Sequence, residues 1–395
     1  MPVPTPFHAR TAALCQSYRW KDWAGHYAVC AYGPCHEPEY YAIRHAAGLL
    51  DVTPLFKYRI TGKDAARLLA WVLCRDVTRL KPGRVAYSTW CDDRGHLLDD
   101  GTVTRLYDEE YRLTSAEPSY AWLCSQAGPY DVLIEDVTTE IAALALQGPT
   151  SREILRCCTD ADLDALRFFG HTRARLEGRP VELTRTGYTG DLGYELWMAN
   201  EDALAVWDAL LSHGQAYGLL PIGLDALDMS RVEAGFVLQG IDYISARHAL
   251  VDAQKSTPYE LDLGFTVHLD REPFIGQAAL RAEQARGPRW AFAGLVIDWC
   301  ELEALYDAHG LPPGVSACAW RDARPVYSQG RQVGRATSGT FSPTLKQNLA
   351  LATLDADQAA PGTQLEIEVT VEYQRRTVSA VVTEKPFFDP ERKRA

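Results

Sequence analysis

A glutamate inside an apolar run is the first residue of this sequence that could bind a ligand. Glu195 lies in TRTGYTGDLGYELWM (184–198), between Tyr194 and Leu196. Aromatic residues favour a β-strand, and the glycines at 187, 190 and 193 allow the preceding chain to approach a neighbouring group closely. A buried carboxylate needs hydrogen-bond donors. The alternative is that Glu195 faces water from the polar side of a half-exposed strand.

Two further groups of residues could take part in catalysis or in ligand binding. Asp99 and Asp100 are adjacent in GHLLDD (95–100), and from the residues alone we interpret them as carboxylates of a turn. The N-terminal segment is rich in aromatic side chains, which usually fill a core. Alternatively, they form a cage that binds a methylated ammonium or sulfonium through cation–π attraction. These aromatics are Trp20, Trp23, Tyr27, Tyr32, Tyr40 and Tyr41.

The composition is that of an ordinary globular protein. The chain has 395 residues, with 47% hydrophobic and 23% charged residues, enough for two or three domains. The formal net charge of −12 argues against nucleic acid as a partner. No apolar run approaches the roughly 18 residues of a membrane helix, and the start lacks a signal-peptide pattern, so we expect a cytoplasmic protein. Ten cysteines without a CxxC pair predict buried free thiols and no metal site.

The elements that position these residues follow a repeated order. A strand at 57–62 precedes a helix from about 64 to 74, with Thr61 and Asp64 as a capping box. Residues 84–106 predict a hairpin around the turn CDDRGH, and residues 109–128 predict a strand, a turn and a helix.

Residues 141–214 repeat this order. They predict a strand, a helix with Thr150 and Glu153 as a capping box, a hairpin at 180–198 and a helix at 200–214. We therefore expect two pseudo-repeated α/β halves around a central crevice.

The sequence pattern changes after these two halves. A helix from residue 223 ends at Gly235, and from about Ala291 short strands separated by Gly and Pro predict a small β-barrel or sandwich. The expected class is α+β, with a core at residues 1–275 and a barrel domain at 276–395.

At this point the chain resembles the aminomethyltransferase family, the T-protein of the glycine cleavage system and its relatives. The resemblance extends over nearly the whole chain and rests on motifs that occur in the family's order. These motifs are LALQGP (144–149), TRTGYTGDLGYEL (184–196), SRVEAGFVLQGIDY (230–243), TSGTFSPTLKQNLALA (337–352) and EKPFFDP (384–390).

The resemblance implies a three-part fold around a tetrahydrofolate in a central channel. Glu195 falls where the family binds the pterin edge, whose amino group and ring N–H one carboxylate can accept together. Tyr188 and Arg231 match family positions expected to bind the cofactor. Asp99 matches the catalytic aspartate, which orients folate and stabilises positive charge on its nitrogen, whereas Asp100 is left undecided.

The departures from the family lie on the substrate side. Leu227 replaces an arginine, RLTSAEP (112–118) lacks an asparagine, and DVTPL (51–55) replaces DVSHM. These changes predict retained folate and a changed substrate, with Tyr27, Tyr32 and Leu227 as substrate residues.

The primary functional prediction is a tetrahydrofolate-dependent demethylase that converts a methylated small molecule and gives 5-methyl-tetrahydrofolate; the methyl donor is left open. A lipoyl carrier protein is then an unlikely partner. The alternatives are a glycine-cleavage aminomethyltransferase that acts on a lipoyl carrier, and a folate-binding regulator without catalysis.

Overall fold

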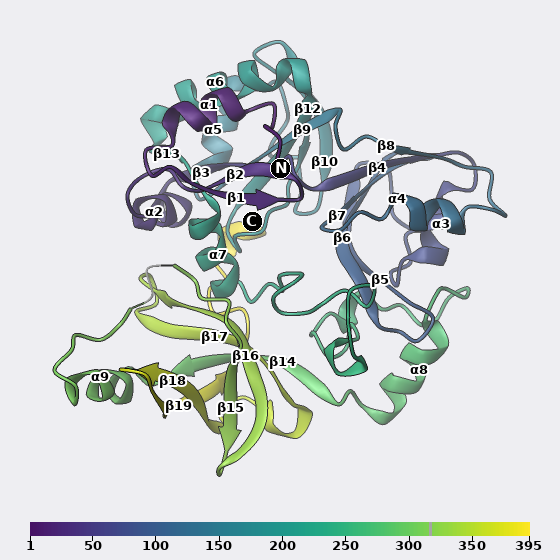
Figure 1. Cartoon of the computed structure of the whole chain (residues 1–395). Coiled ribbons are helices and arrows are strands. Elements are labelled where there is room, and N and C mark those ends of the chain that lie inside the picture. Colours follow the sequence, from purple (N-terminus) through teal and green to yellow (C-terminus); the bar gives the residue numbers. More distant parts are fainter. Residues whose placement is uncertain (316–317) are drawn as a thin grey trace.

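The chain forms three units arranged around a centre (Figure 1). The computed structural model describes residues 1–315 and 318–395. The first unit is built on a five-stranded sheet, the second on a six-stranded sheet, and the third is a closed barrel. We call them the first unit, the second unit and the barrel unit.

The first unit has a sheet of order β5-β6-β7-β4-β8. Its elements are β4 (Phe56–Thr61), α3 (Ala65–Val72), β5 (Arg84–Cys91), β6 (Leu97–Tyr107), β7 (Glu110–Ser115), α4 (Tyr120–Gln126) and β8 (Leu133–Asp136). The alternating strands bury Tyr58, Val103 and Leu113 on one face, against Leu69 of α3 and Leu123 of α4. The opposite face is left to polar residues.

The second unit has a sheet of order β10-β11-β12-β9-β3-β13. Its sheet and covering helices are β3 (Ala47–Asp51), β9 (Ile141–Gln147), α5 (Ser151–Cys158), β10 (His171–Leu176), β11 (Arg179–Thr184), β12 (Gly193–Ala199), α6 (Ala203–Gly214) and β13 (Leu219–Pro221). The N-terminal elements and one later helix complete it: α1 (His8–Leu14), β1 (Arg19–Trp23), β2 (His26–Ala31), α2 (Glu37–His45) and α7 (Leu224–Glu233). Its core packs Leu196 of β12 against Leu155 of α5 and Trp207 of α6.

The predicted pseudo-repeat is confirmed. The strand order β5-β6-β7-β4 in the first unit matches β10-β11-β12-β9 in the second. A helix follows β4 and β9, and another follows β7 and β12. The two hairpins seen in the sequence are not equivalent, however. Asp99 and Asp100 lie on β6, which matches β11, whereas Glu195 lies on β12, which matches β7.

The barrel unit confirms the expected C-terminal barrel. Its closed order is β14-β17-β16-β15-β18-β19. The strands are β14 (Trp290–Ile297), β15 (Arg324–Ser328), β16 (Arg331–Ser342), β17 (Gln347–Asp355), β18 (Gln364–Val371) and β19 (Gln374–Thr383), with α9 (Trp299–Asp307) after β14. Leu295, Val326, Leu354 and Ile367 fill its interior. The expected boundary at residue 275 falls before α8 (Gln277–Arg286), which precedes the first barrel strand.

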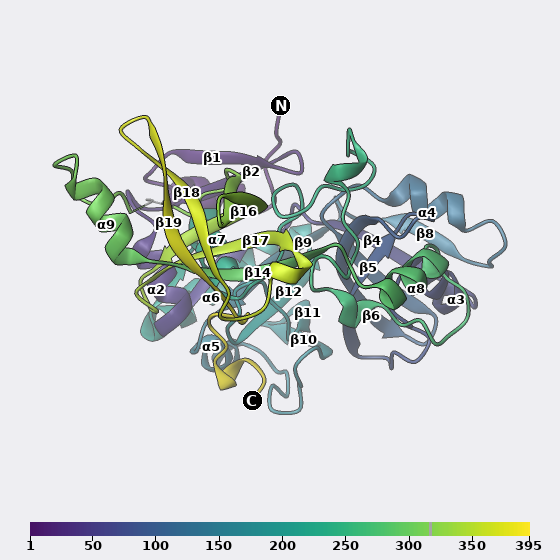
Figure 2. The ribbon, with the colours of Figure 1, turned by 90° about the horizontal axis from the view of Figure 1, so that it is seen from below.

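The C-terminal tail leaves the barrel and packs on the second unit. Arg392 donates to both carboxylate oxygens of Asp191, at 2.7 and 2.8 Å. Arg152 of α5 donates to the terminal residue Ala395 at 2.9 Å, and Figure 2 shows the C-terminus close to α5. The tail therefore holds the glycine-rich loop that contains Asp191 in place.

Two local predictions are wrong because tertiary partners take the polar side chains. Thr61, the expected capping residue of α3, is instead the last residue of β4. Asp64 and Thr150 directly precede α3 and α5, but neither side chain caps its helix. Asp64 accepts from the backbone N–H of Asp131, and the Thr150 hydroxyl donates to the Tyr217 carbonyl. The cysteines are also not uniformly buried, since several are exposed: Cys35, Cys124, Cys157 and Cys300.

A buried ion pair joins the second unit to the barrel unit. Arg44 of α2 donates to Glu233 Oε2 of α7 from Nε at 2.9 Å and from Nη2 at 2.6 Å. The hydroxyls of Tyr40 and Ser342 donate to the other oxygen, Oε1. Ser342 belongs to β16, so one carboxylate connects α2, α7 and the barrel.

We expect Glu233→Gln to lower the free energy of unfolding by about 2–3 kcal/mol, because it removes the nearer of the two buried carboxylates that pair with Arg44 and leaves only Asp191, at 3.5 Å. Urea unfolding measures this change. Glu135→Gln is the matched control, since Glu135 and Arg59 are 3.9 Å apart and both largely exposed. The control is expected to change stability by less than about 0.5 kcal/mol. Equal losses in the two variants would contradict the role of this network.

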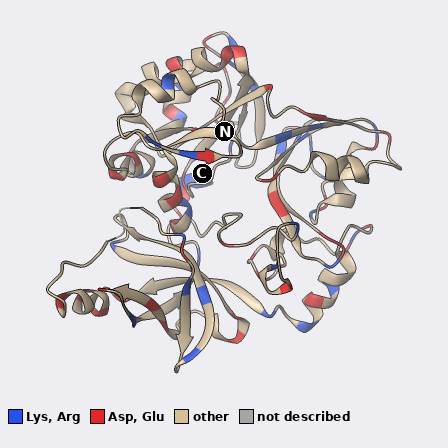
Figure 3. Ribbon diagram, viewed as in Figure 1, with Lys and Arg blue, Asp and Glu red and all other residues tan. Residues whose placement is uncertain are grey.

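The placement of the charged residues and the hydropathy of the helices are those expected from the composition. In the view of Figure 3, acidic and basic residues are interspersed over all three units. Among the described residues, no helix is both long and apolar enough to cross a membrane.

Candidate functional site

The first unit presents a polar sheet face. Val103 of β6 pairs with Leu113 of β7, and both enter the core. The neighbouring pair, Thr102 and Thr114, points to the other face, where the two hydroxyls are 2.6 Å apart. Because side chains alternate along a strand, Asp100 and Arg112 lie on this same face.

The second unit opposes this face with β12. Leu196 enters the core, so its neighbours Glu195 and Trp197 point to the other side. The Arg112 guanidinium lies over the Trp197 ring, 4.3 Å from its centroid, and donates from Nη1 to Glu182 Oε2 of β11 at 2.6 Å. Arg112 therefore bridges the polar faces of the two pseudo-repeated sheets, and the candidate site lies between these faces.

Glu195 has one occupied and one open oxygen. Oε2 accepts from the hydroxyls of Thr186 at 2.6 Å and Thr184 at 3.4 Å. Oε1 has no hydrogen-bond partner among the described residues, and the side chain is partly exposed. Burial raises the pKa of the carboxyl, while the threonines and the charge of Arg112 lower it. This arrangement leaves acceptor capacity for N–H donors of a ligand.

The glycines before β12 make room for a glutamine. A Cβ added to Gly187 or Gly193 would lie 1.9 or 2.3 Å from Gln147 Oε1, so a larger residue would displace the Gln147 amide. Gln147 Nε2 donates to the carbonyls of Thr186 and Tyr194, and Oε1 accepts from Thr189. The side chain of Gln147 thus fixes the loop that carries Tyr188.

Tyr188 packs on Phe236, and the charge of Asp100 acts on its phenol. Its ring stacks on Phe236 with centroids 5.6 Å apart, and its hydroxyl donates to the Val237 carbonyl. Burial raises the pKa of the phenol; the charge of Arg231 opposes this and the charge of Asp100 adds to it. The predicted cofactor residue is therefore close to Asp100.

Asp100 is the more accessible of the two aspartates. It is partly exposed and accepts hydrogen bonds from two phenols, Tyr87 at 2.7 Å and Tyr243. Burial raises the pKa of Asp100, and these two hydrogen bonds lower it. Its carboxylate lies on the face that opposes the second unit, where developing positive charge could be stabilised.

Asp99 has a different environment. It is 1% exposed, and its oxygens accept from the backbone N–H groups of Asp100 at 2.8 Å and Glu117 at 2.9 Å. Burial, together with the charge of Asp100, raises the pKa of Asp99 well above its usual value. This geometry argues against the sequence-based choice of Asp99 as the carboxylate that contacts a ligand, and favours Asp100.

Arg231 is a structural residue in this arrangement. It is 1% exposed and donates to Asp228 at 2.6 Å, Asp242 at 2.7 Å and Ser338 at 3.0 Å. Ser338 belongs to β16, so Arg231 joins α7 to the barrel. These partners occupy its Nε and Nη1, so only Nη2, which is buried without a hydrogen-bond partner among the described residues, remains for the predicted contact with a cofactor.

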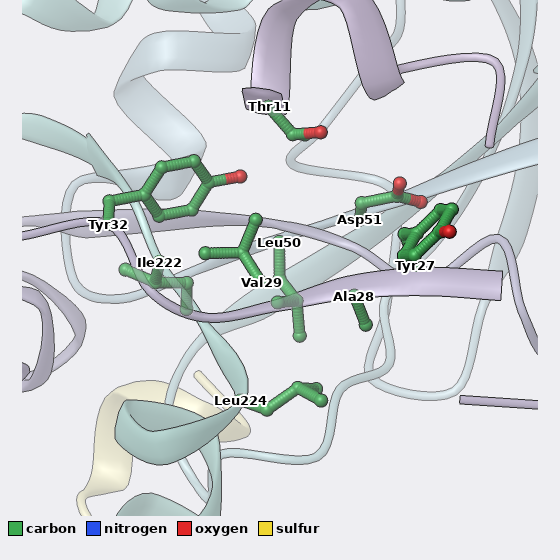
Figure 4. Close-up of a pocket in the computed structure, with 9 residues that line it drawn as sticks. All are labelled: Thr11, Tyr27, Ala28, Val29, Tyr32, Leu50, Asp51, Ile222 and Leu224. Atoms are coloured by element: carbon green, nitrogen blue, oxygen red, sulfur yellow. The ribbon is translucent and has the colours of Figure 1, made fainter. Parts of the chain in front are cut away.

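The predicted substrate residues do not form a single pocket. Tyr27 and Tyr32 line one cavity of about 10 Å³, together with Thr11 and Asp51 (Figure 4). That volume accommodates about one water molecule, not a methylated substrate. Leu227 instead packs into an apolar cluster with Trp23 and Leu55. The cage formed by Tyr27 and Tyr32 is therefore not supported.

Arg112, Tyr87 and Tyr243 were missed in the sequence. A signal existed for Arg112, since EYRLTS (110–115) alternates between core and polar positions. Tyr87 lies two residues before Thr89, which pairs with Asp100 across the hairpin. Tyr243 lies outside any strand or helix, and only the fold brings it to the aspartates.

Comparison with known proteins identifies the family. The GCVT N-terminal domain model matches residues 7–271, and the glycine cleavage T-protein C-terminal barrel domain model matches residues 311–389. The chain belongs to the glycine cleavage T-protein family. An aminomethyltransferase of Caldanaerobacter subterraneus subsp. tengcongensis is 35% identical over 355 residues, covering 89% of this chain and 87% of that protein. The aminomethyltransferase of Bacillus subtilis is 33% identical over 356 residues, covering 89% and 90%.

A solved T-protein structure shares the fold. The crystal structure of glycine cleavage system aminomethyltransferase T from Bartonella henselae has a TM-score of 0.83 and 23% identity, covering 98% of this chain and 99% of that one. The family resemblance and the three-part fold are therefore confirmed. The aminomethyltransferase family uses tetrahydrofolate, in agreement with the predicted cofactor.

Proposed function

We propose that this protein transfers a one-carbon unit to tetrahydrofolate between the opposed polar faces, with an aminomethyl group on a lipoyl carrier protein as the donor. The observation that carries the folate part is the open Oε1 of Glu195, on a carboxylate whose other oxygen is held by two threonines. The aminomethyl part rests on relatives named aminomethyltransferase that are 33–35% identical over 89% of the chain. These relatives therefore favour the alternative prediction, an aminomethyltransferase, over the demethylase.

The residues present fit a tetrahydrofolate. A pterin edge offers an amino group and a ring N–H side by side, which Glu195 can accept. When bound, tetrahydrofolate supplies the nitrogen nucleophiles that accept the carbon. Asp100 would stabilise positive charge at the reacting nitrogen, and the phenols of Tyr87 and Tyr243 hold its carboxylate in place.

The overall transfer balances without a redox partner. The carbon leaves the lipoyl sulfur, which becomes a thiol, and ammonia leaves that carbon. The product is 5,10-methylene-tetrahydrofolate, whose carbon has the same oxidation level as the donor carbon. A regulator without catalysis would have no need for a carboxylate held in this way by two phenols.

Demethylation of a small molecule is the second candidate function. The observation that favours it is Leu227, which lies where the family pattern has an arginine and packs in an apolar cluster. A compact methylated molecule needs a partly apolar environment with few polar contacts. Its product would be 5-methyl-tetrahydrofolate, which is more reduced than the methylene form.

The product distinguishes these two functions. We expect purified enzyme with tetrahydrofolate and an aminomethyl-loaded lipoyl carrier to release ammonia and form 5,10-methylene-tetrahydrofolate in equal amounts. Parallel reactions contain methylated oxygen, nitrogen and sulfur compounds in place of the carrier. Formation of 5-methyl-tetrahydrofolate from one of these, without turnover of the carrier, would replace the aminomethyl proposal with the demethylase.

A further inference from the structure

Arg112 is a buried cation with unused donors beside Glu195. The residue is 3% exposed, and its Nη1 is occupied by Glu182 at 2.6 Å. Its Nε and Nη2 are buried without a hydrogen-bond partner among the described residues. Such donors are rare in native structures, because burying an unsatisfied group costs about 1–3 kcal/mol.

The unpartnered Nε and Nη2 donors of Arg112, which we call its free edge, lie in the same polar region as Glu195. The guanidinium stacks on Trp197, whose indole N–H donates to Thr184 at 3.2 Å, and Thr184 donates to Glu195. The charge of Arg112 lowers the pKa of Glu195, against the larger effect of burial. Yet these two residues form no ion pair within 4.0 Å in the described part of the chain. Open donors and an open acceptor therefore lie near each other without satisfying each other.

The charge balance indicates which kind of acceptor is missing. Burial raises the pKa of Glu182, but His171, whose Nε2 lies 3.4 Å away, and the charge of Arg112 lower it to about 2. Glu182 is thus ionised and neutralises Arg112, so a second anion on the free edge would meet two nearby carboxylates. A neutral carbonyl oxygen is a better partner.

We propose that Arg112 donates to the C4 carbonyl of the pterin and so selects 4-oxo-pterins. The 2-amino group, the N3–H and the C4 carbonyl lie in a row on the pterin edge, as two donors followed by one acceptor. Glu195 Oε1 and the free edge of Arg112 offer the complementary acceptor and donors. This inference rests on the proposed folate-binding function and adds a specificity residue to it.

The structural role of Arg112 does not account for the free edge. The bridge to Glu182 uses Nη1, and the stacking on Trp197 uses the guanidinium face. Neither contact needs the Nε and Nη2 donors. A lysine at this position would keep the charge and the bridge but would lose the planar fork.

The test compares tetrahydrofolate with 4-amino-4-deoxytetrahydrofolate, which presents a donor where the carbonyl was and has no hydrogen on N3. The preference of the wild-type protein therefore has a Glu195 part and an Arg112 part, and the Arg112 variants separate them. By calorimetry, we expect the wild-type protein to bind the 4-oxo compound at least about tenfold more tightly, since an acceptor is replaced by a group that opposes the Arg112 donors. Arg112→Met and Arg112→Lys are expected to lower this ratio at least about threefold, and the preference that remains is the part due to Glu195. Glu182→Gln is the matched control, because it weakens the bridge and the pairs of Glu182 with His171 and Arg173 but leaves the Nε and Nη2 donors of Arg112 in place, so its ratio is expected to stay at the wild-type value.

The outcomes separate this inference from the proposed function. If the wild-type protein binds neither compound, the folate proposal itself fails, and this inference with it. If it binds tetrahydrofolate but does not prefer the 4-oxo form, or if folded Arg112 variants keep the wild-type ratio, only the role of Arg112 is overturned. Thermal unfolding identifies the folded variants, and Arg112→Lys, which keeps the charge, supplies the comparison if Arg112→Met does not fold.

Discussion

Replacing Asp100 with asparagine is expected to lower turnover by about 100-fold while changing tetrahydrofolate affinity less than threefold, as for the loss of one preorganised electrostatic group. The carboxylate is held by the phenols of Tyr87 and Tyr243 on the face that opposes Glu195. Asparagine keeps the shape but removes the charge, so the loss is greatest where positive charge develops. Single-turnover kinetics measure the transfer rate and calorimetry measures the affinity.

The pH dependence of turnover gives a second measurement. Asp100 must be ionised to stabilise positive charge, and burial raises its pKa above the ordinary value. Activity is therefore expected to fall with decreasing pH at a higher pH than an unperturbed aspartate would give. This acidic limb would be absent from the residual activity of Asp100→Asn.

Asp99→Asn is the control for the neighbouring position. Both Asp99 oxygens accept backbone N–H groups, so an amide would turn a donor toward one of them. We expect lower stability and a turnover loss below tenfold. A large loss of turnover in Asp99→Asn with normal stability, together with a small loss in Asp100→Asn, would return the catalytic role to Asp99.

The fold could be predicted from the sequence because its signals are local. Alternation in EYRLTS, glycines around the second hairpin and Gly–Pro breaks after apolar strands all act over a few residues. Their order gave the pseudo-repeat, and the strand order of the two sheets agrees with it. The equivalence of the two hairpins was wrong, because β6 and β12 occupy different positions in the repeat.

The site could be predicted only in part, because it is built between units. Asp99 and Asp100 are adjacent, so their roles depend on which side chain points to the opposed face. That orientation is set by the pairing of β5 with β6, which contains an irregularity between Trp90 and Cys91. Motif matching could not supply it.

Packing argues against other site predictions. Arg231 looked like a ligand-binding cation, but Asp228 and Asp242 pair with it. Tyr27 and Tyr32 do line a common cavity, yet neighbouring side chains leave space for only about one water in its 10 Å³. Arg112 can be recognised as a candidate residue only once β7 is placed opposite β11 and β12. Its partners Glu182 and Trp197 are about 70 to 85 residues distant in the chain.

Glu195→Ala is expected to weaken tetrahydrofolate binding by about 2–3 kcal/mol, a 30- to 150-fold higher Kd, because charge-assisted hydrogen bonds to the pterin edge are lost. Oε1 is the atom available for those bonds, since Oε2 is held by Thr186 and Thr184. Calorimetry on the wild-type and variant proteins measures the difference. Glu195→Asp keeps the charge but shortens its reach, so an intermediate Kd is expected.

Stability distinguishes a ligand-binding Glu195 from a structural one. Burial raises the pKa of this carboxyl, so the folded protein holds its charge at a cost that the threonine hydroxyls and Arg112 only partly offset. If Glu195 served mainly to stabilise the fold, its removal would lower the free energy of unfolding, as we expect for Glu233→Gln. We expect Glu195→Ala instead to leave the free energy of unfolding within about 0.5 kcal/mol of the wild type. An unchanged Kd, or a loss of stability that matches the loss of affinity, would remove Glu195 from the binding site.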